Sequence, residues 1–469
     1  MINPFSVKNM VKKDFIVGDI PASRKAYDTS LRIALPSVVE MVSMAFIQMM
    51  SIAMVGELGH EAVAAVGLVG QPRMIFMSLF FALNVGCTAV VARRKGAGEQ
   101  AQARLCLRQA LMVGFVISIV MAALAVSLAS PMMRLAGAQY DTIDMATSYF
   151  RITSMGLTLN ALTMTISAAQ RGIGNTRVTM VVNIAANIVN VLFHYLLIHG
   201  RLFFPAMGVE GAAIAILISS AVGLVLALYS VFKPGTYLRL SIKDSWRPDI
   251  PMLKSIANVG GNSIFEQLCL RIGFFAYARI VANLGTMEFA AHQIAMQLMN
   301  LSFTFADGIA VATTALVGQN LGSKRPDLSI MYGKIGQRLA FIVSVMLCTA
   351  VIFGRWWFPT LFLDPDYGYN YQVIATAASL LLITVAILPL QTSQLVMAGS
   401  LRGSGDTKYV AFTMLLSVAI VRPLSALLLV FGLGMGIQGA WYAIIADQIL
   451  RMGLLYHRFS SGKWTKIKV

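Results

Sequence analysis

The sequence predicts an all-α integral membrane protein, with twelve transmembrane helices forming two six-helix bundles related by a pseudo-two-fold axis along the membrane normal. Three observations predict this fold. The chain of 469 residues is 57% hydrophobic and only 12% charged, whereas soluble domains average about 25% charged residues. Apolar runs of about 20 residues, the length of a membrane-spanning helix, recur along the chain. The two halves of the chain also resemble each other in sequence.

The apolar runs are expected to be helices, because lipid offers the backbone no hydrogen-bond partners and a helix satisfies its own. The twelve runs lie near residues 31–56, 62–92, 106–130, 143–168, 178–199, 209–232, 253–282, 288–318, 336–359, 373–398, 408–431 and 437–456.

The net charge of +17 follows the positive-inside rule. If the N-terminus is cytoplasmic and the helices alternate direction, the segments rich in Lys and Arg all fall on the cytoplasmic side. These segments are 8–32, 93–108, 171–177, 233–254, 324–338, 402–408 and 451–468. We therefore expect a multi-pass protein of the cytoplasmic (inner) membrane with both termini in the cytoplasm. Because the charge is spread over loops and forms no basic domain, we expect no nucleic-acid partner.

Three pairs of similar segments indicate an internal duplication, and they are separated by 226 to 231 positions. The pairs are LGHEAVAA (58–65) with LGTMEFAA (284–291), QRGIGNTR (170–177) with LRGSGDTK (401–408), and GVEGAAIA (208–215) with GIQGAWYA (436–443). Six helices thus repeat in the same order and orientation, as in parallel-repeat transporters.

The duplication divides the chain into five predicted parts. A cytoplasmic N-terminal segment spans 1–30, and the two bundles span 31–232 and 253–456. A cytoplasmic linker at 233–252 joins them, and a basic tail follows at 457–469. The alternative to a transport role is a purely structural duplication, but two bundles around one axis would form a central cleft suited to alternating access.

Two acidic residues in the predicted membrane region occupy equivalent positions. Glu40 and Glu266 lie 226 residues apart, so each half carries one carboxylate at the same depth. Ionisable residues inside a membrane are rare and usually mark ion or substrate pathways. The pair therefore predicts a functional site.

Polar residues follow the same helical faces. In the predicted helices near 288–318 and 178–199, residues spaced three or four apart form two stripes, and Tyr277 lies on the face of Glu266. The stripes are Gln293, Gln297, Asn300, Thr304 and Asp307, and Asn183, Asn187, Asn190 and His194. Each stripe either lines a wet, cation-accessible wall or only joins helices through hydrogen bonds.

Carboxylates and amide oxygens suit a hard cation such as Na⁺, and a buried carboxylate equally suits a proton. Glu266, Asp406 and the stripe near 288–318 could therefore bind either ion, with Na⁺ possible at Glu266 and no structural metal expected. Asp406 has an alternative role as a helix cap, and His194 either titrates near neutral pH or only forms hydrogen bonds. Met44 and Met296 are candidates for substrate contact, although methionine also serves as lipid-facing filler.

Several motifs together resemble the MATE family of multidrug and toxic-compound extrusion antiporters, over about residues 30–456. They are LPSVVE, VGELG, RGIGNT, IFEQL, AAHQIA and RGSGDT. The resemblance implies efflux of small organic cations and drugs in exchange for Na⁺ or H⁺, by a monomer in the lipid bilayer without another cofactor or enzymatic activity. It matches Glu266 to the family's essential carboxylate in the seventh helix and Asp406 to an acid that belongs to the same C-terminal cation site in many members. Gln293 matches the glutamine of the family's AAHQ signature.

The sequence departs from this family in its N-terminal half. Where many prokaryotic members carry an aspartate, this chain has Ser51 in the first helix, and where others carry one it has His194 in the fifth. Glu40 is a candidate substitute, although it lies eleven residues before Ser51. The alternative function is a lipid-linked saccharide flippase of the related families, which often have two further helices.

Overall fold

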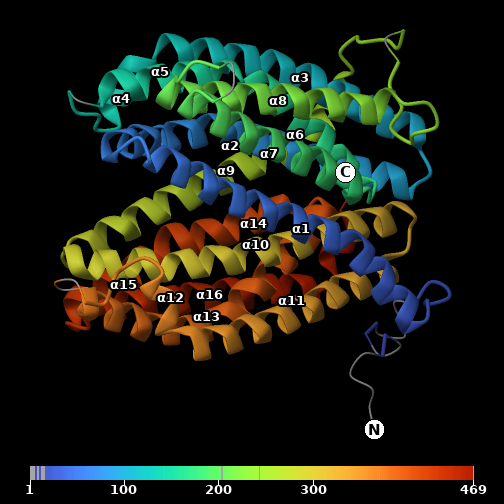
Figure 1. Cartoon of the computed structure of the whole chain (residues 1–469). Helices are drawn as coiled ribbons and strands as arrows, with labels where there is room; N and C mark the ends of the chain where they lie inside the picture. The colour runs from blue at the N-terminus through green and yellow to red at the C-terminus, as the bar shows by residue number, and fades with distance from the viewer. Residues whose placement is uncertain are drawn as a thin grey trace. The chain divides into compact units, whose positions relative to one another are not determined.

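The computed structural model describes residues 6–7, 10–11, 16–140, 142–201, 204–241, 243–366, 368 and 370–467, apart from the side chains of His60 and Gln71. Every regular element in these residues is a helix, as the sequence predicts (Figure 1).

Eight helices form the N-terminal half of the chain. They are α1 (Ser23–Gly56), α2 (His60–Gly96), α3 (Gln100–Ser127), α4 (Ala129–Leu135), α5 (Ile143–Met155), α6 (Leu157–Gly172), α7 (Thr176–His199) and α8 (Gly208–Phe232).

The C-terminal half contains longer helices and two π-helical segments. They are α9 (Ile250–Ala282), α10 (Thr286–Gly322), α11 (Pro326–Gly354), α12 (Trp357–Thr360), α13 (Asn370–Ser404), α14 (Thr407–Met414), η2 (Leu415–Val421), α15 (Arg422–Leu427), η3 (Leu428–Gly432), α16 (Gly436–Ser460) and the 3₁₀ turn η4 (Lys463–Lys466).

The twelve predicted helices are confirmed as helical regions of the chain. Within the described residues, nine stretches are long and apolar enough to cross a membrane. The predicted helix near 143–168 is divided at Gly156 into α5 and α6, and neither piece alone has the length to span. The other two, α9 and α16, carry several charged residues, among them Glu266 and Asp447.

The chain forms two compact units. One unit comprises Met1–Val38 and Asn262–Val469, and the other comprises Val39–Gly261. The boundaries therefore fall inside α1 and α9, so each of these long helices contributes to both units. Glu40 belongs to the Val39–Gly261 unit and Glu266 to the other.

The duplication is visible in the backbone of the connecting turns. Gly174 ends the α6–α7 turn with φ 82°, and its counterpart Gly405 ends the α13–α14 turn with φ 90°. Side chains strongly disfavour this left-handed region, which explains why both copies of the octapeptide keep glycine there. Lys324, the counterpart of Gly98, adopts φ 58° even though it is not glycine.

Helices α10 and α13 pack closely because two glycines of α13 face α10. A Cβ atom at Gly399 would lie 2.8 Å from the carbonyl oxygen of Ala310, and one at Gly403 would lie 2.3 Å from that of Thr314. The hydroxyl of Thr314 donates a hydrogen bond of 2.8 Å to the carbonyl of Gly399. Small residues spaced four apart allow this approach between membrane helices, and it fixes the end of α13, where Arg402 lies.

Candidate functional site

Glu266 on α9 is almost fully buried, with 1% of its surface exposed. It forms an ion pair with Arg402, which lies in the last turn of α13. Arg402 Nη2 donates to Glu266 Oε1, and Arg402 Nε lies 3.4 Å from Oε2. The carboxylate is thus held by a two-point contact with a guanidinium, as in the bidentate pairs that arginine forms with carboxylates.

Glu40 on α1 has an equivalent arrangement in the other unit. Its side chain is fully buried, with 0% exposed, and Arg171 at the end of α6 lies 3.3 Å from its Oε1. Two residues of α7 add hydrogen bonds, since Thr179 Oγ1 lies 2.8 Å from Oε2 and Asn183 Nδ2 donates to Oε1 at 2.6 Å. Each half of the chain therefore carries one buried glutamate paired with one arginine.

The two arginines are the partners of the glutamates, and the sequence interpretation missed them. Arg171 and Arg402 occupy the same place in the repeated octapeptide, and the sequence interpretation placed them only as markers of a loop. The signal was present, because the glutamates and the arginines are both duplicated. A pairing in one half therefore implies the same pairing in the other.

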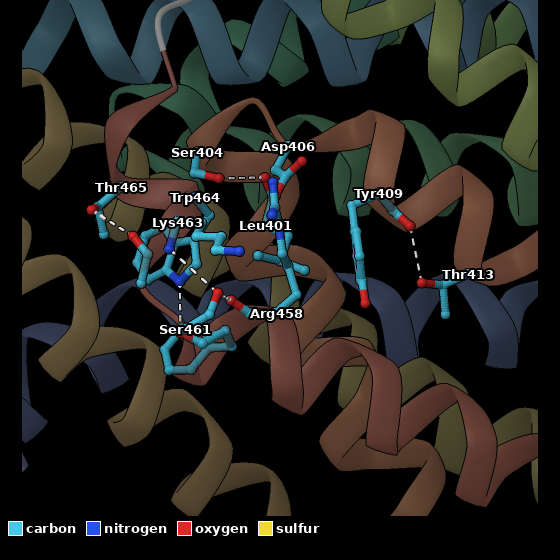
Figure 2. Close-up of polar contacts among 12 residues, drawn as sticks. Leu401, Ser404, Asp406, Tyr409, Thr413, Arg458, Ser461, Lys463, Trp464 and Thr465 are labelled. Carbon is cyan, nitrogen blue, oxygen red and sulfur yellow. Dashed lines mark hydrogen bonds and ion pairs between the residues drawn. The ribbon is translucent and has the colours of Figure 1, made fainter.

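Asp406 lies close in sequence to Arg402 but has a different partner. Its Oδ2 accepts a hydrogen bond of 2.6 Å from Arg458 Nε of α16, and Arg458 in turn lies over the ring of Tyr409. Figure 2 shows this corner of the unit, with Trp464 beside it. Asp406 occupies the N-cap position of α14, yet its side chain forms no capping hydrogen bond. The alternative role as a helix cap is therefore wrong, because the arginine takes the carboxylate.

The polar stripe on α10 divides into two parts. Its first three members, Gln293, Gln297 and Asn300, lie on an exposed face of the helix, whereas His292, Met299 and Ser302 on the opposite face are buried. Thr304 donates to the backbone carbonyl of Asn300 at 3.0 Å.

Asp307, the last member of the stripe, is half-buried and interacts electrostatically with Arg402. The structure thus brings Asp307, but not the glutamines, toward the Glu266–Arg402 pair.

Tyr277 belongs to a second buried cluster further along α9. Its hydroxyl donates to the carbonyl of Ala440 at 3.0 Å, and its ring lies 5.7 Å from that of His292. Arg422 lies over the same ring, with its guanidinium carbon 5.8 Å from the ring centre. Tyr277 therefore contacts the helices around α16, and its hydroxyl is engaged away from Glu266.

The centre of this second cluster is a buried charge triad. Arg422 Nη2 and Arg451 Nη2 lie 2.5 Å and 2.7 Å from Asp447 Oδ2, and all three side chains are at least 95% buried. Arg451 also interacts electrostatically with Glu266. Opposite charges consequently alternate through the unit from Arg402 to Glu266, Arg451, Asp447 and Arg422.

Ser51 and His194, where the resemblance to the MATE family implies aspartates in other members, both contact Asn190. Ser51 Oγ donates to Asn190 Oδ1 at 3.3 Å, and Asn190 Nδ2 donates to Ser219 Oγ at 3.2 Å. His194 is buried, with its Nδ1 2.9 Å from the carbonyl of Asn190. On the next turn of α7, Asn187 Nδ2 is buried without a hydrogen-bond partner among the described residues.

The two candidate methionines differ in their surroundings. Met44 on α1 is exposed, whereas Met296 on α10 is half-buried and packs against the apolar core around α10, α13 and α16. No group of three His, Cys, Asp or Glu side chains that could hold a metal ion is found among the described residues.

Comparison with known proteins adds the family. Residues 36–196 and 263–437 match the sequence model of the MatE family. A probable multidrug resistance protein NorM from Thermotoga maritima is 28% identical, covering 98% of this chain and 96% of the relative. An uncharacterized transporter, YisQ of Bacillus subtilis, is 26% identical, with 88% and 89% covered.

Solved structures agree on the fold. The outward-facing conformation of a multidrug resistance MATE family transporter of the MOP superfamily superposes with a TM-score of 0.86 at 21% identity, covering 93% of this chain and 97% of the other. The family match spans both halves of the duplication and well over half of the chain. The chain therefore belongs to the MatE family and is a multi-pass membrane transporter.

Proposed function

We propose that this chain is a secondary active efflux antiporter that exports small organic cations and drugs from the cytoplasm in exchange for Na⁺ or H⁺. The substrate class is supported by relatives named as probable multidrug resistance proteins. The proposed location is the inner membrane, with both termini cytoplasmic, as the distribution of Lys and Arg favours. No further cofactor is proposed.

The observation that carries this proposal is the buried Glu266–Arg402 pair. An ionised carboxylate at membrane depth is stable only while a positive charge accompanies it. The accompanying charge is either the guanidinium or a bound cation or proton. Glu266 can therefore exist in two states, one paired with Arg402 and one carrying the coupling ion.

Ion binding at Glu266 can shift the transporter only if the two conformations bind the ion with different affinity. The arginine supplies this difference, because a conformation that holds Arg402 on Glu266 excludes the ion. In the proposed cycle, an ion arriving from outside neutralises Glu266 and releases Arg402. This favours the inward-facing state, in which the drug binds. The ion is released inside from this inward-facing state, and the return of the two bundles to the outward-facing state then releases the drug outside.

The test is efflux of an organic cation such as ethidium from proteoliposomes holding the purified protein, with only a Na⁺ gradient in one arm and only a pH gradient in the other. We expect one gradient to drive efflux, and Glu266→Gln to abolish it. Glu99→Gln is the matched control, because Glu99 pairs with Arg94 on the surface. If the wild type shows no dye efflux under either gradient, the proposal is contradicted and the flippase function is favoured.

A further inference from the structure

The Glu40 cluster is the buried ionisable group that the proposed coupling at Glu266 leaves unused. It consists of Glu40, Arg171, Thr179 and Asn183, all within the Val39–Gly261 unit. The repeat makes it the counterpart of the Glu266 site, so the differences between the two clusters show what each can bind.

The repeat places apolar residues where the Glu40 cluster has its two α7 ligands. Thr179 corresponds to Val410 and Asn183 to Met414, both 231 positions later and both buried. In the other direction, Asp307 near Arg402 corresponds to Phe81, 226 positions earlier. The Glu40 cluster therefore has two neutral oxygen-bearing side chains that the Glu266 site lacks, and it lacks the second carboxylate.

These side chains can offer their oxygens to a cation. The Thr179 hydroxyl lies 2.8 Å from the carbonyl of Thr176, so donating its proton there leaves its lone pairs facing Glu40. A rotation of the Asn183 amide by half a turn exchanges its nitrogen for its oxygen at the same place. Together with the two Glu40 oxygens, this makes four oxygen donors, the ligand type that hard cations such as Na⁺ prefer.

Arg171 supplies the positive charge of this cluster, and it is loosely held. Its distance of 3.3 Å from Glu40 Oε1 exceeds the roughly 2.7–2.9 Å of a close charged pair. Its Nε is buried without a hydrogen-bond partner among the described residues, and 22% of its side chain is exposed. Arg171 therefore gains little at Glu40 and has a route to solvent, so its replacement by a small cation conserves the charge of the cluster.

We propose that Glu40, Thr179 and Asn183 form a second cation site, specific to the N-terminal half, which binds an alkali metal ion of the Na⁺ class when Arg171 moves away. Its part in transport rests on the proposed function, whereas ion binding at this site does not depend on Glu266. The competing view is that the cluster is a permanent ion pair that only joins α1 to α6 and α7.

The experiment measures Na⁺-dependent stability of the purified protein in the Glu266→Gln background, so that Glu266 contributes no ion pair or ion site. NaCl replaces choline chloride at constant ionic strength and pH, and the thermal unfolding midpoint is followed. A bound ion raises this midpoint with a saturating dependence on its concentration. We expect this rise in the Glu266→Gln variant. We also expect a loss of apparent Na⁺ affinity of about tenfold or more when Thr179→Val and Asn183→Met are added.

Those two substitutions introduce the residues that the other half already buries at equivalent positions, so we expect the fold to be retained. Ser51→Ala is the matched control, because Ser51 joins the same two helices through Asn190 without contacting Glu40. If the double variant unfolds without a clear transition, calorimetric titration of Na⁺ into Thr179→Val alone replaces it.

Three outcomes would overturn the proposal. The first is a thermal unfolding midpoint that does not rise with Na⁺ in the Glu266→Gln variant. The second is an unchanged Na⁺-dependent rise when Thr179→Val and Asn183→Met are added. The third is stabilisation by lower pH in place of Na⁺, which would make Glu40 a proton carrier. The proposed efflux function fails separately, if the wild type shows no dye efflux under either the Na⁺ or the pH gradient.

Discussion

Arg402 determines whether Glu266 is paired or available to an ion. It reaches Glu266 from the last turn of α13, and its side chain is 19% exposed while that of Glu266 is 2% exposed. Breaking one side of a buried ion pair is more damaging than removing both, because the remaining charge has no partner.

Arg402→Gln is therefore expected to lower the free energy of unfolding by about 3–5 kcal/mol. The Glu266→Gln/Arg402→Gln double variant should recover most of that loss, because it leaves no uncompensated charge. Chemical unfolding in detergent measures both. Arg94→Gln, which breaks an exposed pair with Glu99, should cost about 0–1 kcal/mol. A double variant less stable than Arg402→Gln would show that the pair is not a unit.

Asp447 is the carboxylate of the second cluster, and its substitution is expected to destabilise the protein strongly. Asp447→Asn leaves both Arg422 and Arg451 buried without their negative partner, and we expect a loss of about 3–5 kcal/mol or more in unfolding free energy. Thermal unfolding checks this, with Asp244→Asn as the control because its pair with Arg108 is longer, at 3.5 Å, and partly exposed. Equal midpoints for the two variants would contradict the expectation.

The sequence predicted the acidic members of the two sites better than the basic ones. Glu40 and Glu266 stood out because a charge in an apolar run is unexpected. The repeat also placed the two glutamates at equivalent positions in the two halves. Arg171 and Arg402 lie at helix ends, where the positive-inside rule already explains an arginine. Their long side chains extend from the helix end to a buried carboxylate, and helical spacing alone does not reveal that reach.

At the level of elements, the close packing of α13 on α10 positions Arg402. Gly399 and Gly403 have no room for a side chain, because a Cβ atom would lie 2.8 Å from the carbonyl oxygen of Ala310 and 2.3 Å from that of Thr314. These contacts hold the end of α13 beside α10, where Asp307 interacts with Arg402.

Gly403→Ala is expected to force α10 and α13 apart and to lower the free energy of unfolding by about 1–3 kcal/mol. Efflux should fall as well, because Arg402 directly precedes Gly403 in the chain. Gly453→Ala in α16 is the control, since a Cβ there meets no atom within 4 Å. Thermal unfolding and dye efflux measure both variants. A Gly403→Ala variant as stable as Gly453→Ala would contradict the packing argument.

Helical periodicity predicted the elements but not the direction in which a polar stripe faces. The stripe on α10 does lie along one side of the helix, yet Gln293, Gln297 and Asn300 are exposed while only Asp307 approaches the ion pair. The π-helical segments around α15 were also not predicted, because an apolar run carries no information about whether hydrogen bonds span four or five residues. Pro423, which lacks a backbone N–H, was the available signal.

For the whole chain, the duplication predicted the most. The apolar runs gave the helices, and the duplication gave their division into two halves with one buried glutamate at the same position in each. The copies then diverged in their ligands, with Thr179 and Asn183 on one side and Asp307 on the other. Equivalent backbones thus carry different side chains around the two buried glutamates.

The most direct test of the central claim separates coupling from substrate binding in Glu266→Gln proteoliposomes. Gradient-driven ethidium efflux and ethidium exchange without any gradient are measured in the same preparation. If Glu266 is the coupling carboxylate, the variant should lose the driven efflux and retain the exchange. Glutamine keeps the shape of the side chain but has no negative charge with which to bind Na⁺ or H⁺. Driven efflux at the wild-type rate in Glu266→Gln would contradict the account.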